Sequence, residues 1–135
     1  MYGRTEDEWE QLRESAVYHL EAAAKSRSTI DYSTLNHQIA DETGLPPFDF
    51  TKQTGRDAIA QLLAEISEDT HARHGIMLSA LVTHKGSANL GGGFYKLASK
   101  LGQMPANPTT NQKDEALSRL TAEVHDHYAR RASAR

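Results

Sequence analysis

The chain has 135 residues, the size of one domain, and its 38% hydrophobic and 24% charged content is typical of a globular protein rather than a disordered one. Because it has no cysteine, a disulfide scaffold, a thiolate nucleophile and a cysteine-ligated metal site are all excluded. No apolar run reaches the roughly 20 residues that cross a bilayer, and the first residues lack the pattern of a signal peptide, so we expect a cytoplasmic protein without membrane contact. We expect one domain over 1–135, with a core at about 5–131 and a frayed tail at 132–135.

The net charge of −3 argues against strong non-specific binding to nucleic acid, but it hides an asymmetry along the chain. The first 24 residues carry six acids against two bases. No acid lies between Asp69 and Asp114, whereas five basic residues do: Arg73, Lys85, Lys96, Lys100 and Lys113. The sequence therefore predicts one acidic and one basic face. Two interpretations stay open: electrostatic steering of a partner, or a solvated acidic helix beside a loop-rich half.

A capping-box spacing marks the start of the first expected helix, because Thr5 and Glu8 can each satisfy a backbone amide of the other's turn. Apolar residues recur every three or four positions over 6–25, so one stripe faces a core: Trp9, Leu12, Ala16, Leu20 and Ala23. A shorter second helix is expected over 33–43, where Gly44 and a following proline pair end it.

Two aromatic residues, Phe48 and Phe50, follow the proline pair and are expected to pin this connection to the core. Thr54 and Asp57 repeat the capping spacing and precede an apolar stripe at helical intervals. The sequence therefore predicts a third helix from Thr54 to about Arg73, with a glycine cap two residues later.

The second half of the chain mixes extended and helical signals. The run 76–84 has apolar residues on both faces, which predicts a largely buried central strand. A glycine-rich turn or wing is expected at 86–93, a short helix over 94–101 capped by Gly102, and a last helix over 113–131. Together these elements predict a mainly α fold with a small β element, arranged as a compact winged-helix-like single domain.

The order of elements from 16 to 102 resembles the winged-helix domain of the alkylguanine alkyltransferase and alkyltransferase-like proteins. IDYSTLNHQIADETG, TGRDAIAQLLAEI and LSALVTHKG follow one another as that family's "TYxxLA" helix, "RAVGxAL" helix and "PCHRVV" strand do. The resemblance implies the fold alone, since Leu78, Ser79 and Ala80 stand where the family has its reactive cysteine and histidine. Thiolate alkyl transfer is excluded.

A second pattern is similar to that of a group of short, uncharacterised bacterial and phage proteins, "LLSALVVxKxxGxPGxGFFxLAxxLG". This chain has LSALVTHKGSANLGGGFYKLASKLG, with Gly91 in place of the proline-glycine lead. The likeness covers about 62–102. It implies kinship with phage- or defence-related proteins and no particular activity.

The glycine triplet 91–93 is the first candidate site. Its amides at a helix start can attract a phosphate or carboxylate, with Lys85 and Lys96 as countercharges. The alternative is a tight turn that lets Phe94 and Tyr95 pack. Neither a P-loop nor a dinucleotide fingerprint is present. The candidate ligand-binding residues are His84, Lys85, Gly91, Gly92, Gly93, Tyr95, Lys96 and Lys100.

Catalytic and metal chemistry find little support in the sequence. Two histidine pairs, 71/74 and 125/127, lack an HExxH pattern or a cysteine partner, and histidines near helix carboxyl ends are favourable without a metal. Thr83 occupies the position where an "ExK" nuclease needs a carboxylate, and Ser79 lies outside any nucleophile elbow. We therefore expect no catalytic residue, no metal and no cofactor.

Two hypotheses about function remain, with an enzyme of unrecognised type third. The first is a non-enzymatic binding module, phage- or defence-related, that contacts nucleic acid or an anionic ligand through the basic segment 84–100. Its aromatic residues Tyr32, Phe94 and Tyr95 can stack on bases only if they are exposed. The four acids of the third expected helix argue against its use as the DNA-reading helix of a helix-turn-helix motif. The second hypothesis is a protein-interaction or inhibitor module whose acidic helix, 6–21, meets a basic partner.

Overall fold

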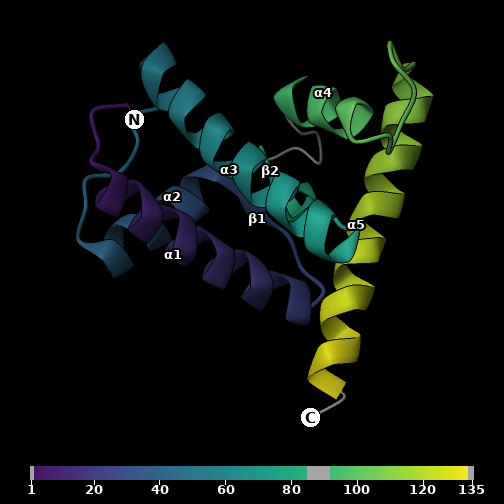
Figure 1. The fold of residues 1–135 in the computed structure, drawn as a ribbon, viewed down its shortest axis with the longest axis horizontal. Helices are drawn as coiled ribbons and strands as arrows, with labels where there is room; N and C mark the ends of the chain where they lie inside the picture. The colour runs from purple at the N-terminus through teal and green to yellow at the C-terminus, as the bar shows by residue number, and fades with distance from the viewer. Residues whose placement is uncertain (1, 85–91, 134–135) are drawn as a thin grey trace.

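The computed structural model describes residues 2–84 and 92–133 (Figure 1). Helices make up most of it: α1 (Glu6–Lys25), α2 (Tyr32–Thr43), α3 (Gln53–His74), α4 (Gly92–Lys100) and α5 (Thr110–Ser133). Three short elements lie between them: the strands β1 (Ile30–Asp31) and β2 (Val82–Thr83) and the 3₁₀ turn η1 (Leu78–Leu81). The mainly α fold with a small β element is thus confirmed. The winged-helix arrangement stays a prediction, because most of the expected wing lies outside the described residues.

The first helix has the predicted bounds and the predicted cap. The Oγ1 of Thr5 accepts the backbone N–H of Glu8 at 3.1 Å, and the Thr5 N–H donates to the Glu8 carboxylate at 2.9 Å. These bonds satisfy amides that the first turn of a helix leaves without partners. The helix α2 begins one residue earlier than predicted, because Asp31 caps it and accepts the N–H of Thr34 at 2.8 Å.

The start of α3 differs from the prediction. The helix begins at Gln53 after Lys52, and no side chain caps it, so the predicted Thr54–Asp57 capping pair is wrong. Asp57 instead accepts a hydrogen bond from the Gln53 side chain at 2.7 Å. The predicted glycine cap is confirmed, since Gly75 ends the helix in the left-handed region at φ 72°.

The central strand predicted over 76–84 is wrong for most of its length, since only β2 pairs with another strand. The preceding residues form η1, whose backbone is held by side chains of α3. The N–H of Ser79 donates to the Oγ of Ser67 at 3.0 Å, and the N–H of Leu78 donates to the Oγ1 of Thr70 at 3.3 Å. Because these hydroxyl groups satisfy the buried amides, the segment needs no neighbouring strand.

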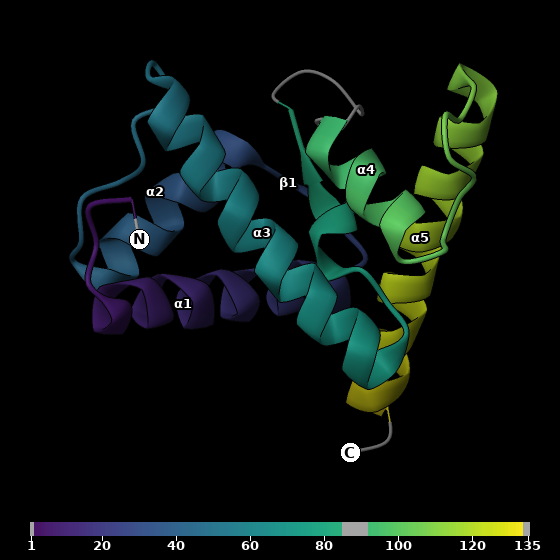
Figure 2. The same ribbon diagram turned by 45° about the horizontal axis from the view of Figure 1, so that its top comes forward.

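Two hydrophobic clusters meet at η1. Figure 2 shows the helices that enclose them, with α2 on one side of α3 and α4 and α5 on the other. Leu78 and Leu81 belong to the cluster that α1, α2 and α3 enclose, together with the last turns of α5. Met77 and Ala80 belong to the second cluster, which α4 and the first half of α5 complete. Consecutive residues of one buried turn therefore join the two halves of the molecule.

The carboxyl-terminal helix is longer than predicted. Thr109 and Gln112 exchange hydrogen bonds at its start, at 2.9 and 3.2 Å, so α5 begins at Thr110 rather than at 113. It continues to Ser133, two residues beyond the predicted end of the helix, and the last two residues of the tail predicted from 132 lie outside the described residues. Over the described ranges, none of the helices combines the length with the apolar composition that crossing a membrane requires.

Candidate ligand groove at the ends of the parallel strands

The two short strands bring distant parts of the chain to one point. They pair in parallel, with Ile30 opposite Val82 and Asp31 opposite Thr83. The next residue of each strand therefore emerges on the same side. These residues are Tyr32 and His84, whose ring centroids lie 5.0 Å apart with a tilt of 32° between the rings. The carboxyl ends of parallel strands are a common place for ligands, because the chains diverge there and leave a crevice.

An open groove of about 450 Å³ lies at this point. Ligand pockets in proteins commonly enclose about 300–1,000 Å³, so one small molecule fits it. Its walls are mostly apolar and aromatic, with a few polar groups among them. The lining comes from α2 (Tyr32 and Ser33), the following connection (Phe50), α3 (Arg56, Ile59 and Ala60) and the end of β2 (His84).

Arg56 carries a permanent positive charge at the groove, and two hydrogen bonds hold its side chain in place. Its Nη1 donates to the backbone oxygen of Phe50 at 2.7 Å, and its Nη2 donates to the side-chain oxygen of Gln53 at 2.9 Å. A guanidinium has five N–H donors, so several stay available for a ligand. Within the part of the chain that the structure describes, Arg56 forms no ion pair with a carboxylate.

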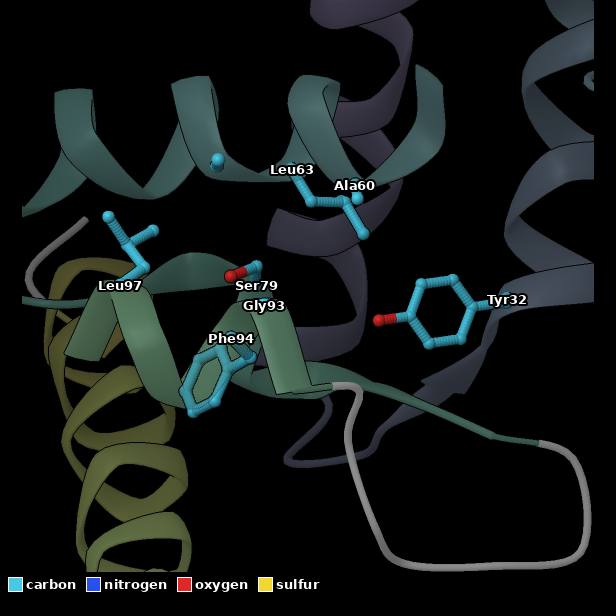
Figure 3. Close-up of a pocket in the computed structure, with 8 residues that line it drawn as sticks. Tyr32, Ala60, Leu63, Ser79, Gly93, Phe94 and Leu97 are labelled. Carbon is cyan, nitrogen blue, oxygen red and sulfur yellow. The ribbon is translucent and has the colours of Figure 1, made fainter. Parts of the chain in front are cut away.

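A narrow slot of about 30 Å³ adjoins the groove (Figure 3). Tyr32 and Ala60 line both cavities, so they stand at the junction. Figure 3 shows the hydroxyl of Tyr32 directed toward Gly93 and Ser79, which line the slot between α3 and α4. The remaining slot residues are apolar: Leu63, Ala64, Phe94 and Leu97.

Ser79 is the buried polar group of the slot, with only 6% of its surface exposed. The hydroxyl of Ser67 donates to the Oγ of Ser79 at 2.6 Å, and the same oxygen of Ser67 accepts the Ser79 N–H. Since Ser79 acts as the acceptor of this bond, its own hydroxyl hydrogen is left for another acceptor. The slot thus combines a hydroxyl donor with an apolar lining.

The predicted ligand residues divide into two groups. His84 lines the groove, Gly93 lines the slot, and Gly92 begins α4. The predictions for Lys85 and Gly91 lie outside the described residues. The start of α4 at a glycine pair therefore adjoins the slot, and the role of these glycines as ligand residues stays a prediction.

Three further residues lie on α4 but line neither cavity. Lys96 and Lys100 are exposed, one turn apart on the outer surface of the helix. Tyr95 is only 9% exposed, and its ring contacts Phe94 and lies 5.3 Å from the Nζ of Lys113. The prediction of Tyr95 as a stacking surface for bases is therefore wrong, because its ring packs in the second hydrophobic cluster.

The histidine pairs have structural partners in this fold. The rings of His74 and His127 pack together with centroids 4.8 Å apart, at the ends of α3 and α5. His71 contacts the Gln103 side chain at 2.9 Å, and His125 contacts the backbone oxygen of Ser28 at 3.0 Å. Among the described residues, no three potential metal ligands come together.

Sequence reasoning missed Arg56, Phe50 and Ser33 as groove residues. Arg56 carried one signal, since it is a basic residue in the first turn of a helix that follows an aromatic connection. The proximity of Tyr32 to His84 follows from the pairing of two-residue strands. Strands of that length leave no periodic pattern in a sequence.

No family model matches the chain, and neither a curated protein nor a solved structure is significantly similar to it. The two resemblances described above therefore stay predictions.

Proposed function

We propose that the protein is a cytoplasmic, non-enzymatic binding module that takes an anionic ligand, nucleic acid included, in the groove and along the segment 84–100. The observation that carries the proposal is Arg56, whose guanidinium is held in place at a groove of about 450 Å³ and pairs with no carboxylate among the described residues. Hydrogen bonds from a fixed guanidinium to phosphate or carboxylate are among the strongest in proteins.

Other groups at the groove and the slot also favour a negatively charged ligand. His84 lines the same groove, and Gly92 and Gly93 begin α4 beside the slot, where helix amides attract negative charge. Asp31 and Asp57 are held by other groups: Asp31 caps α2, and Asp57 accepts from Gln53. No acidic residue occurs between 69 and 114, so the segment that enters α4 adds only basic charge.

No reaction is assigned to the groove. The described residues that line it include no carboxylate, and the side chains there that could transfer a proton are those of His84 and Tyr32. Catalysis by general acids and bases needs a group that is positioned and oriented by a partner. A binding role uses the groove residues without that requirement.

Two variants test the proposal against inorganic pyrophosphate and a short fluorescent single-stranded oligonucleotide at low salt. Arg56→Ala should weaken the binding of both probes by roughly 10- to 100-fold, the effect of losing charge-assisted hydrogen bonds. Arg73→Ala is the matched control, because Arg73 lies at the other end of α3, is exposed and pairs with Asp69. Wild-type protein that binds neither probe at low salt would show the proposal to be wrong.

An interaction module is the second candidate, because the outer face of α1 is acidic and carries an exposed aromatic ring. Tyr18 is 63% exposed, and Glu14 and Glu21 lie one turn to either side of it on the helix. Exposed tyrosines are enriched where proteins bind one another. A lysine-rich peptide should bind wild type and not the double variant Glu14→Lys with Tyr18→Ser. Equal binding by both proteins counts against this candidate.

A further inference from the structure

We infer that the ligand of the groove carries a flat heteroaromatic ring next to its anionic group, which is the chemistry of a nucleotide, either free or within a single strand. The inference rests on the proposed function, since it assigns the remaining part of the same ligand. It follows from the aromatic wall, the volume of the groove and the small slot that shares two lining residues with it.

The aromatic wall consists of Tyr32 and His84. Their ring centroids lie 5.0 Å apart and the rings are tilted by 32°, so the two rings partly stack on each other and a further flat ring can extend this stack. His84 is exposed and Tyr32 is half-buried, which leaves this surface accessible from the groove. Aromatic side chains beside cations bind bases by stacking, whatever the base, because every base has a π face.

Other residues that line the groove supply the two other requirements of a nucleotide. Phe50 and Ile59 give apolar contact, and the guanidinium of Arg56 lies at the same groove with its Nη1 fixed on the Phe50 oxygen. A nucleotide whose ring is bound in the groove would therefore have its phosphate near the guanidinium of Arg56. The groove of about 450 Å³ admits one nucleotide and excludes stacked base pairs. Double-stranded nucleic acid would have to expose a base before that base could enter.

The slot gives the ring a defined position. Its volume of about 30 Å³ takes a few atoms, the size of an exocyclic oxygen, amino or methyl group. Ser79 offers a hydroxyl hydrogen there, since its Oγ already accepts the bond from Ser67. A ring that stacks on Tyr32 lies beside this slot, because Tyr32 and Ala60 line both cavities.

Ala60 provides the variant that separates ring binding from anion binding. It is exposed on α3 at the junction of groove and slot, so Ala60→Leu fills the space for the ring without disturbing the core. Leucine is also a strong helix former.

The experiment compares a nucleoside 5′-monophosphate with ribose 5-phosphate by calorimetry, since the two probes differ only in the base. Wild type should bind the nucleotide at least tenfold more tightly than the sugar phosphate. Ala60→Leu should abolish this difference, Arg56→Ala should weaken the binding of both probes, and the control Arg73→Ala, outside the groove, should change neither affinity. Circular dichroism and thermal unfolding confirm that each variant is folded.

The outcomes distinguish the inference from the proposed function. Equal affinities of wild type for the two probes overturn the inference and leave an anion-binding groove. Failure of both probes and of pyrophosphate removes the proposed function as well. A single-stranded oligonucleotide that binds more tightly than the mononucleotide supports the strand as the source of the ring, and the reverse order supports the free nucleotide. A duplex that binds as tightly as the single strand overturns the inference.

Discussion

Asn36 of α2 holds the backbone of Phe48 at both of its polar atoms. The Nδ2 of Asn36 donates to the Phe48 oxygen at 2.9 Å, and the Phe48 N–H donates to the Asn36 Oδ1 at 3.0 Å. Both residues are buried, Asn36 at 7% exposed and Phe48 at 6%. The pair fixes the connection between α2 and α3, which also carries the groove residue Phe50.

We expect Asn36→Ala to lower the free energy of unfolding by about 2–4 kcal/mol. The substitution leaves the buried N–H and carbonyl of Phe48 without partners, and each such group costs about 1–3 kcal/mol. Urea unfolding, followed by the single tryptophan, Trp9, measures the change. Asn36→Asp keeps the acceptor for the Phe48 N–H but sets a buried carboxylate oxygen against the Phe48 oxygen, so at neutral pH it should cost at least as much as Asn36→Ala; a negligible cost of either variant would contradict the assigned bonds.

Gly55 allows the same connection to approach α3. A Cβ at this position would lie 1.9 Å from the backbone oxygen of Asp49 and 2.9 Å from its nitrogen. Because backbone atoms cannot rotate away, Gly55→Ala should force the connection outward and destabilise the protein by about 1–3 kcal/mol, the usual cost of overpacking.

The matched control is the same substitution in another helix. Gly93→Ala places its Cβ in open space, so its effect on stability should lie within about 0.5 kcal/mol or be slightly favourable. Thermal unfolding of the two variants side by side checks the contrast. Similar melting temperatures would mean that the connection is not packed against α3 as described.

The helices could be predicted because their signals are local. Thr5 and Glu8 mark the start of α1 through atoms three residues apart, and Gly44 and Gly75 end α2 and α3 through their own positive φ. These interactions depend only on neighbours in the chain, so they are visible in the sequence.

The predicted strand failed because its backbone partners are distant in sequence. In the sequence, Ser67 falls on the apolar face of the predicted third helix. Nothing there indicates that its hydroxyl will accept a hydrogen bond from the N–H of Ser79. The groove was missed for the same reason, since Arg56 and His84 meet only through the tertiary structure. Tyr95 shows the complementary ambiguity: an aromatic residue in an amphipathic segment fits a core and a binding surface equally well until burial is known.

Glu65 should make stability depend on pH. Burial acts to raise the pKa of this carboxyl, but hydrogen bonds from Trp9 and Gln61 and the charge of Arg13 outweigh it, so the pKa lies below its ordinary value of 4.5. The ionised form is therefore favoured by folding. Its contribution is fully present above pH 4.5 and is lost as the pH falls through the lower, folded-state pKa.

Glu65→Gln should remove this part of the acid dependence, and Glu68→Gln, which changes an exposed residue of the same helix, should not. The bond between the Trp9 Nε1 and Glu65 at 3.0 Å also predicts a change of tryptophan fluorescence over the same acid range. The urea unfolding midpoints of the wild type and of both variants, measured between neutral and acid pH, test this expectation. An unchanged acid dependence in Glu65→Gln would contradict the assignment.

The Ser67–Ser79 pair predicts unequal effects of two similar substitutions. Ser67 is fully buried and makes both bonds to Ser79, one to the N–H at 3.0 Å and one to the Oγ at 2.6 Å. Ser67→Ala leaves a buried amide without a partner and should cost about 1–3 kcal/mol. Ser79→Ala removes only the hydroxyl contact, so its cost should be smaller. Because the residues touch, the two effects should not add in the double variant. If Ser79→Ala instead proves the more costly, η1 is held by the hydroxyl pair and not by the amide bond, and the reason given for the missing strand is wrong.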